Sequence, residues 1–246
     1  GYTPLAVTNS GSFNIGAAPV PFTPGNLAVL QLDKSANNTT FSIIEIQPSS
    51  AGQTKPVNIV PISATGSNAL RMANSGSCGR VSLSDDGTLL CFAAFQDGSS
   101  ATADETLNLN RASAGLNYND VLSMGLSYTS TSLGGSQARS CIYLGDNTSA
   151  SGDWIVNDKG GLYEGSGVNV LTEPNLNPYN NVVVRTFGGI PYVLTQKVTG
   201  PSIPGFYSLG FDPDSGLYDV TPFTPGVPID GNAADFYMIS TNGGTT

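Results

Sequence analysis

Apolar and polar residues alternate in short segments along much of the chain, most clearly between residues 76 and 98. Val81 and Leu83 alternate with polar neighbours, whereas residues 89–95 are an almost unbroken apolar run, which is typical of a strand buried on both faces. Between them lies Asp85-Asp86-Gly87-Thr88, which is good turn chemistry because glycine tolerates positive φ. We therefore predict a β-hairpin whose two-residue turn at Asp86-Gly87 places Ser82 opposite Cys91.

Other segments with strand character lie on both sides of this hairpin. Upstream, the pattern predicts an antiparallel pair at 27–32 and 41–46, then a strand segment at 57–62. Downstream, related strand–turn–strand patterns begin at Ser140, where Cys141 aligns with Cys78, and at 181–194, where the turn is 187–189. A further copy begins at 234–239. We expect 118–128 to pair with part of 101–115, and 101–109 is the segment nearest to a short helix.

The repeated units indicate the fold class. Strand–turn–strand units with glycine at the turn, repeated at irregular spacings, favour a β-propeller built of such units. The alternative for a chain of 246 residues is a β-sandwich or jelly roll. We predict a single all-β domain over 1–246, in which the Gly-, Pro-, Ser- and Thr-rich residues 1–25 form an extended N-terminal arm.

The order of several segments resembles that of a group of secreted bacterial proteins. The segments are TPGNLAVLQL (23–32), GRVSLSDDGTLLCFAAF (79–95), VVVRTFGGIPYVLTQ (182–196), GFYSLG (205–210) and FTPGVPIDGNAADFYMIS (223–240). The group consists of predicted β-propellers, many of which carry a C-terminal PEP-CTERM sorting signal. The resemblance implies a secreted propeller and supplies no site residues.

Composition and charge limit the classes of partner that the chain could bind. The net charge is −9, and only 9 Lys and Arg face 18 Asp and Glu, so clustered basic residues for nucleic acid or for an anionic membrane are missing. No apolar run is long enough for a transmembrane helix. A chain with few charges and much Ser, Thr and Asn suggests an extracellular protein. Three sequons, which chance could also produce, are candidate glycosylation sites at Asn37, Asn38 and Asn147.

The three cysteines, Cys78, Cys91 and Cys141, leave at least one thiol unpaired within the chain. If Ser82 lies opposite Cys91, Cys78 is about 13 Å further along the strand. That separation exceeds the Cα distance of about 7 Å that a disulfide permits. We therefore expect no disulfide between Cys78 and Cys91.

The residue types exclude several chemistries. The chain has no histidine, no CxxC pair and no glycine-rich phosphate loop, which argues against His-based catalysis, zinc and nucleotide cofactors. Paired carboxylates could serve a glycosidase, but 18 acids do not single out one pair. A polysaccharide lyase could use a tyrosine base with arginines on a uronate, and the candidates are Arg80, Arg139, Arg185, Tyr143, Tyr163 and Tyr192.

Each candidate also has a structural interpretation. Arg80 and Arg185 lie at strand positions, where a salt bridge or a carbonyl clamp between repeats is the commoner use. Trp154 could stack on a sugar, yet a tryptophan in an apolar strand more often belongs to the core. Asp212 and Asp214, with Asp219, resemble the start of a calcium loop, although D-x-D-x-G is also hairpin-turn chemistry. Calcium is the one cofactor that the sequence suggests.

These observations favour a secreted propeller that acts as a binding or structural module for a glycan or a partner protein. The alternative is an extracellular polysaccharide lyase or glycoside hydrolase. Only one strand of the last unit, 235–240, precedes the polar tail, so its apolar residues would lack a covering strand. We therefore expect a second chain or subunit to complete the fold, and cleavage near Gly243-Gly244 would be one source of it.

Overall fold

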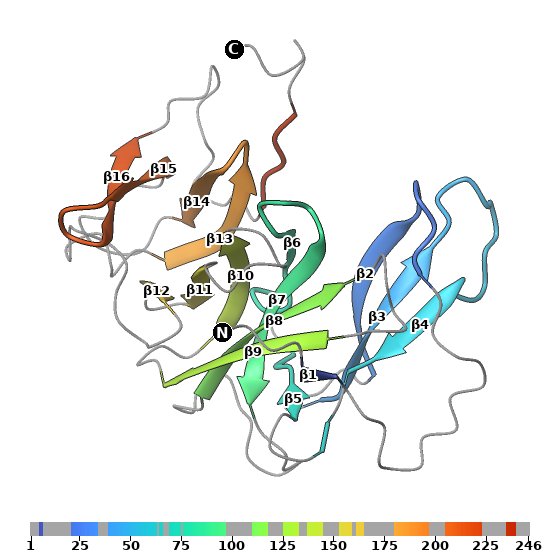
Figure 1. Cartoon of the computed structure of the whole chain (residues 1–246). Coiled ribbons are helices and arrows are strands. Elements are labelled where there is room, and N and C mark those ends of the chain that lie inside the picture. Colours follow the sequence, from blue (N-terminus) through green and yellow to red (C-terminus); the bar gives the residue numbers. More distant parts are fainter. Residues whose placement is uncertain are drawn as a thin grey trace.

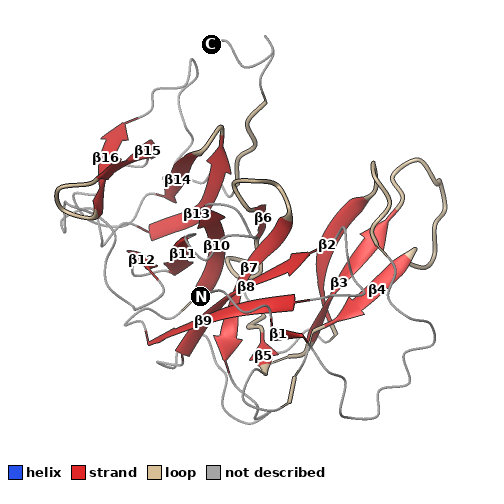
Figure 2. Ribbon diagram, viewed as in Figure 1, coloured by secondary structure: helices blue, strands red, loops and turns tan. Residues whose placement is uncertain are grey.

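The described part of the chain consists of strands and loops. The computed structural model describes residues 5–6, 21–33, 39–62, 64–65, 69–74, 76–96, 110–117, 125–132, 137–144, 153–158, 161–164, 180–196, 205–222 and 235–239. These residues contain no helix (Figure 2), which confirms the all-β class. The described residues therefore include no helix with the length and hydropathy to span a membrane.

Antiparallel pairing groups the described strands into four sheets (Figure 1). Sheet I comprises β2 (Leu27–Leu32), β3 (Phe41–Ile46) and β4 (Asn58–Pro61). Sheet II comprises β1 (Leu5–Ala6), β5 (Leu70–Arg71), β6 (Val81–Leu83), β7 (Leu89–Gln96), β8 (Asn110–Asn117) and β9 (Gly125–Ser132). Sheet III comprises β10 (Ala138–Leu144), β11 (Asp153–Asp158) and β12 (Gly161–Glu164). Sheet IV comprises β13 (Asn180–Phe187), β14 (Ile190–Gln196), β15 (Gly205–Asp212) and β16 (Leu217–Pro222).

The first predicted hairpin forms in the expected register. Strands β6 and β7 pair so that Ser82 lies opposite Cys91, and Gly87 in the turn has a φ of 68°. None of the three cysteines forms a disulfide bond, in agreement with the separation expected between Cys78 and Cys91. Strand β7 is buried on both faces, because its odd-numbered and even-numbered side chains enter two different apolar clusters.

The sheets stack face to face in series. One apolar cluster joins sheets I and II, a second joins II and III, and a third joins III and IV. Figure 1 accordingly shows sheets I and IV at opposite sides of the molecule, with sheets II and III between them. A fourth cluster lies on the outer face of sheet IV, where Phe236 and Met238 pack against it.

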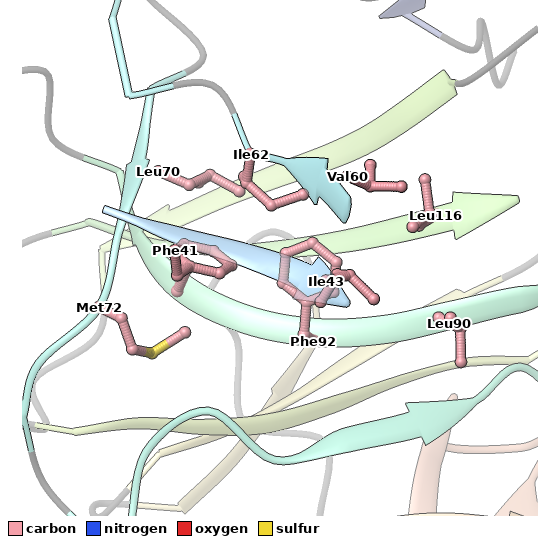
Figure 3. Packing of buried hydrophobic residues seen from close by; sticks show 10 residues of the cluster. Phe41, Ile43, Val60, Ile62, Leu70, Met72, Leu90, Phe92 and Leu116 are labelled. Atoms are coloured by element: carbon pink, nitrogen blue, oxygen red, sulfur yellow. The ribbon is translucent and has the colours of Figure 1, made fainter. Parts of the chain in front are cut away.

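The cluster between sheets I and II is dense and aromatic (Figure 3). Phe41 of β3 and Phe92 of β7 meet edge to face, with ring centroids 5.7 Å apart. Ile43 and Leu70 are completely buried beside them. Edge-to-face aromatic pairs add to the stabilisation that burial already provides. Burial of this kind joins sheets I and II, whose described strands share no ladder, and an isolated bridge between Thr39 and Met72 adds two backbone hydrogen bonds beside the cluster.

The structure confirms some of the predicted strand and turn boundaries and refines others. The strands at 27–32 and 41–46 have the predicted bounds, and β4 lies within the predicted 57–62. The turn between β13 and β14 is Gly188-Gly189 alone, both at positive φ as a two-residue type I′ turn requires, so Phe187 belongs to the strand. The N-terminal arm contributes Leu5–Ala6 to the edge of sheet II. The helix candidate 101–109 lies outside the described residues.

Two expectations were wrong. Residues 235–239 were predicted to form a strand, but they join no ladder among the described residues. The alignment of Cys78 with Cys141 is not the structural equivalence, because Cys141 lies within β10 whereas Cys78 precedes β6. The alignment was based on the Ser-Cys dipeptide that both segments contain. Strand register depends on the pattern of apolar residues, and this dipeptide does not determine it. In addition, residues 205–222 form a hairpin that completes a four-stranded sheet IV.

Candidate functional site

The polar side chains of interest gather where strands β6, β10 and β13 meet, and we call this region the inner seam. It comprises Arg80, Ser82, Arg139, Ser140, Val184, Arg185 and Thr186, together with Asp235. The three strands come from sheets II, III and IV and lie close to one another near the centre of the molecule (Figure 1). The inner seam thus adds polar contacts between three sheets that also meet through apolar side chains.

Hydrogen bonds cross the seam from sheet to sheet. The Arg80 amide donates to the Arg139 carbonyl at 3.0 Å, and the Ser82 hydroxyl donates to the Val184 carbonyl at 3.0 Å. The Val184 amide in turn donates to the Ser140 hydroxyl at 3.0 Å. Buried polar groups must find partners, and these three bonds satisfy them between sheets rather than within one. The seam therefore fixes how the sheets are positioned relative to one another.

The seam hydroxyls are poorly placed for catalysis. Ser82 and Ser140 are buried, and the Ser140 hydroxyl also accepts a hydrogen bond from the side-chain Nδ2 of Asn157 at 3.2 Å. An attacking serine needs a general base and access to substrate. With no histidine in the chain and both hydroxyls engaged in bonds between sheets, these residues serve structure.

Arg185 is the best-connected side chain of the seam. Its Nη1 donates to the Val81 carbonyl at 2.9 Å, which anchors the guanidinium to sheet II. Its Nε and Nη2 donate to the two carboxylate oxygens of Asp235, at 3.1 and 2.9 Å. Such two-pronged binding is the strongest and most directional way in which arginine holds a carboxylate. A salt bridge and a carbonyl clamp, the two structural uses that the sequence favoured for this arginine, are both present.

Arg80 lies beside the same carboxylate. Its Nη1 is 3.9 Å from Asp235 Oδ2, and its Nη2 donates to the Gly76 carbonyl at 3.3 Å. Burial lowers the pKa of Arg80 below its ordinary value, an effect that Asp235 opposes and Arg185 reinforces. The Nε of Arg80 is buried and has no hydrogen-bond acceptor among the described residues. Two guanidinium groups therefore face one carboxylate.

The remaining lyase candidates do not join this cluster as an exposed set. Arg139 is buried and donates to the Gln137 side chain. Tyr143 and Trp154 pack in the core between sheets II and III with ring centroids 5.0 Å apart, and Trp154 is only 6% exposed. Tyr192 is buried and stacks on Phe206, and Tyr163 is half-buried at the edge of the core between sheets II and III. Sugar stacking needs an exposed ring face, which Trp154 does not offer.

The candidate calcium residues form an ordinary turn. The Asp214 amide and the Ser215 hydroxyl donate to the two carboxylate oxygens of Asp212, at 2.9 and 2.8 Å, which lowers the pKa of Asp212. Asp219 lies on β16 opposite Gly210. Among the described residues, no three acidic or other metal-binding side chains form a group that could hold an ion. The hydrogen bonds within the turn agree with the hairpin-turn interpretation, and calcium binding stays a prediction.

The remaining candidates from the sequence are the glycosylation sites and the cysteines. Asn37, Asn38 and Asn147 lie outside the described residues. Cys91 is fully buried, and this burial raises the pKa of its thiol, so it is not a reactive thiolate. Asp235 and the two seam serines were not predicted from the sequence. A usable signal was the recurrence of arginine followed closely by a hydroxyl residue, in Arg80-Val81-Ser82, Arg139-Ser140 and Arg185-Thr186.

Comparison with known proteins adds no relative. No family model matches the chain, and neither the curated proteins nor the solved structures give a significant match. The resemblance to secreted bacterial propeller-like proteins therefore stays a prediction.

Proposed function

We propose that the chain is a secreted, propeller-like interaction module whose ligand is another protein. Support for the propeller-like arrangement comes from the four antiparallel sheets stacked in series and from the four-stranded meander of sheet IV. Blades of this kind stack around a common axis in propellers. The described sheets do not by themselves form a closed ring, so closure is part of the proposal.

One observation carries the interaction function: the outermost surfaces of the stack expose apolar side chains. On the outer face of sheet I, Val29 and Ile59 flank Ile44 in register, and Leu27 and Val57 extend the same surface. Leu27, Val57 and Ile59 are each at least half exposed. At the other end, Tyr237 and Ile239 are strongly exposed. Contiguous exposed apolar groups mark protein interaction sites.

The enzyme alternative has weaker support. The aromatic residues that could contact a sugar, Tyr143, Trp154 and Tyr192, are buried, and the arginines that could hold a uronate are bonded within the seam. A glycan ligand would need other residues. A protein partner uses the apolar end surfaces directly, and the shortage of basic residues still disfavours nucleic acid and anionic membranes.

The test is the composition of the native protein in solution. We expect native material to run as a complex with a second chain, and we expect Ile59→Asp or Tyr237→Asp to release that chain. Phe211→Asp is a matched control, because Phe211 is also about half exposed but packs on Tyr218, which belongs to the cluster between sheets III and IV. A free monomer in native material would overturn the proposal. So would turnover of a polysaccharide that is lost when Arg185 is changed.

A further inference from the structure

The segment 235–239 rests on sheet IV through side chains alone. Its residues alternate between exposed and half-buried, as in an extended peptide with one face on a surface. The Phe236 ring meets Phe206 of β15 at 4.5 Å between centroids, and Met238 packs on the same cluster. Asp235 provides the polar contact at the other end. Because no ladder bonds secure the segment among the described residues, its attachment depends on these three side chains.

The surface that receives the segment is held in place by other groups. Arg185 is fixed by the Val81 carbonyl, and Arg80 is fixed by the Gly76 carbonyl. Phe206 stacks on Tyr192 with the rings 13° from parallel. None of these contacts involves Asp235, Phe236 or Met238. The arginine pair and the aromatic platform would therefore keep their arrangement if the segment left, as a pre-organised binding site does.

Charge explains why an acidic group is required there. Arg80 and Arg185 lie close enough to disfavour each other, and Asp235 is the carboxylate that faces them both. The buried Nε of Arg80 remains available as a further donor among the described residues. Asp235 itself is 44% exposed, so a competing carboxylate can approach it. The two guanidinium groups therefore favour binding of an anion, and the carboxylate that now binds them is accessible to solvent.

We propose that Arg80, Arg185 and Phe206 form a docking site for an extended protein segment in which an acidic residue is followed by apolar residues at the first and third positions. In this structure the chain's own Asp235-Phe236-Tyr237-Met238 fills the site. A partner carrying the same pattern displaces it. The pattern follows from the contacts: the carboxylate meets the guanidinium groups, and the two apolar side chains meet the cluster on sheet IV. This deepens the proposed function because it names a peptide segment as the ligand.

The test uses the full chain and a synthetic peptide. The double variant Asp235→Ala, Phe236→Ala empties the site, and a fluorescein-labelled peptide of residues 232–240 (NAADFYMIS) is titrated into it while polarisation is measured. We expect saturable binding to the variant and weaker binding to the unaltered chain, whose own segment competes. A peptide with asparagine in place of the aspartate should bind roughly tenfold more weakly or worse, because a charge-assisted pair is lost.

Two control variants distinguish binding at this site from nonspecific binding of the peptide. Adding Arg185→Ala to the double variant should abolish peptide binding, whereas adding Lys55→Ala, an exposed cation on the loop before β4 of sheet I, should leave it unchanged. Near-ultraviolet circular dichroism checks that each variant is folded. If the double variant does not fold, excess peptide added to the unaltered chain should speed hydrogen exchange at 236–239.

Three results would overturn the proposal. The first is no peptide binding and no change in exchange. The second is peptide binding that is unchanged when the aspartate of the peptide or Arg185 of the chain is replaced. The third is Arg185-dependent binding of oligogalacturonate but not of peptide, which would make this a uronate site. Each of these results leaves unaffected a complex that forms through the outer face of sheet I and is released by Ile59→Asp, so failure here is distinguishable from failure of the proposed function.

Discussion

The packing of sheet I on sheet II and the packing of residues 235–239 on sheet IV both bring apolar side chains together, yet they differ in what secures them. Between sheets I and II the contacting strands belong to ladders, and Phe41, Ile43 and Phe92 are completely buried. On sheet IV, a segment without a ladder places two half-buried side chains and one carboxylate on a prepared surface. The first contact is part of the fold, and the second has the properties of a bound ligand.

Truncating the aromatic core should break the first region. Phe92→Ala removes a fully buried ring that meets Phe41 edge to face, and the loss should be about 3–5 kcal/mol in the free energy of unfolding. Urea denaturation followed by fluorescence measures it. Phe211→Ala, at a position that is 56% exposed, should cost within about 1 kcal/mol. Equal losses at the two positions would show that sheets I and II are not joined by this cluster.

The next largest effect concerns how closely sheet II approaches sheet III. A methyl group at Gly115 of β8 would lie 2.9 Å from Leu89 Cδ1 and 3.1 Å from Trp154 Cη2. Gly115→Ala should therefore cost about 1–3 kcal/mol, through the strain of overpacking. At Gly210, another strand position, a methyl group would meet nothing within 4 Å, so Gly210→Ala is the matched control. Thermal denaturation of both variants compares them, and a neutral Gly115→Ala would contradict the close packing.

The local parts of this fold could be predicted from the sequence, and the contacts between sheets could not. The register of the first hairpin followed from Asp86-Gly87 and from the apolar run after it, because turn type and side-chain alternation act over a few residues. The same holds for the glycine turn at 188–189. Which sheet faces meet depends on packing between distant segments, for which no local pattern exists.

The candidate site shows the same division. Arg80 and Arg185 were recognised as residues that could clamp neighbouring repeats, because arginines at strand positions commonly do so. Their carboxylate partner was not recognised, because Asp235 is 50 residues from Arg185 and lies in a segment that was expected to be a strand. The apolar run at 236–239 predicted a strand. It did not reveal that side chains, rather than a ladder, attach the segment.

Removing the carboxylate should loosen the second region and spare the first. Asp235→Ala should change the free energy of unfolding by about 1 kcal/mol or less, because a partly exposed ion pair is screened by water. Hydrogen exchange should nevertheless become faster at 236–239 while the amides of β7 stay protected. Asp214→Ala, an exposed acid in the β15–β16 turn, is the control and should leave exchange at 236–239 unaltered. Equal protection of 236–239 with and without Asp235 would show that the carboxylate does not hold the segment.

The smallest effect concerns Asp212 in the turn between β15 and β16, whose carboxylate is held by hydrogen bonds rather than by an arginine. The Ser215 hydroxyl and the Asp214 amide stabilise ionised Asp212, so its pKa in the folded chain lies below its unfolded value. A lowered pKa contributes stability that is present above the unfolded pKa and is lost as the pH falls through the folded pKa. Ser215→Ala should move the pKa of Asp212 back up towards its ordinary value, as carboxyl chemical shifts in an acid titration by NMR would record. Because the Asp212 carboxylate lies at the surface, where water screens its interactions, the change in global stability should be barely measurable. If the pKa of Asp212 does not change in Ser215→Ala, the backbone amide is the cause of the shift. If added calcium strongly stabilises the chain, the turn interpretation is replaced by a metal site.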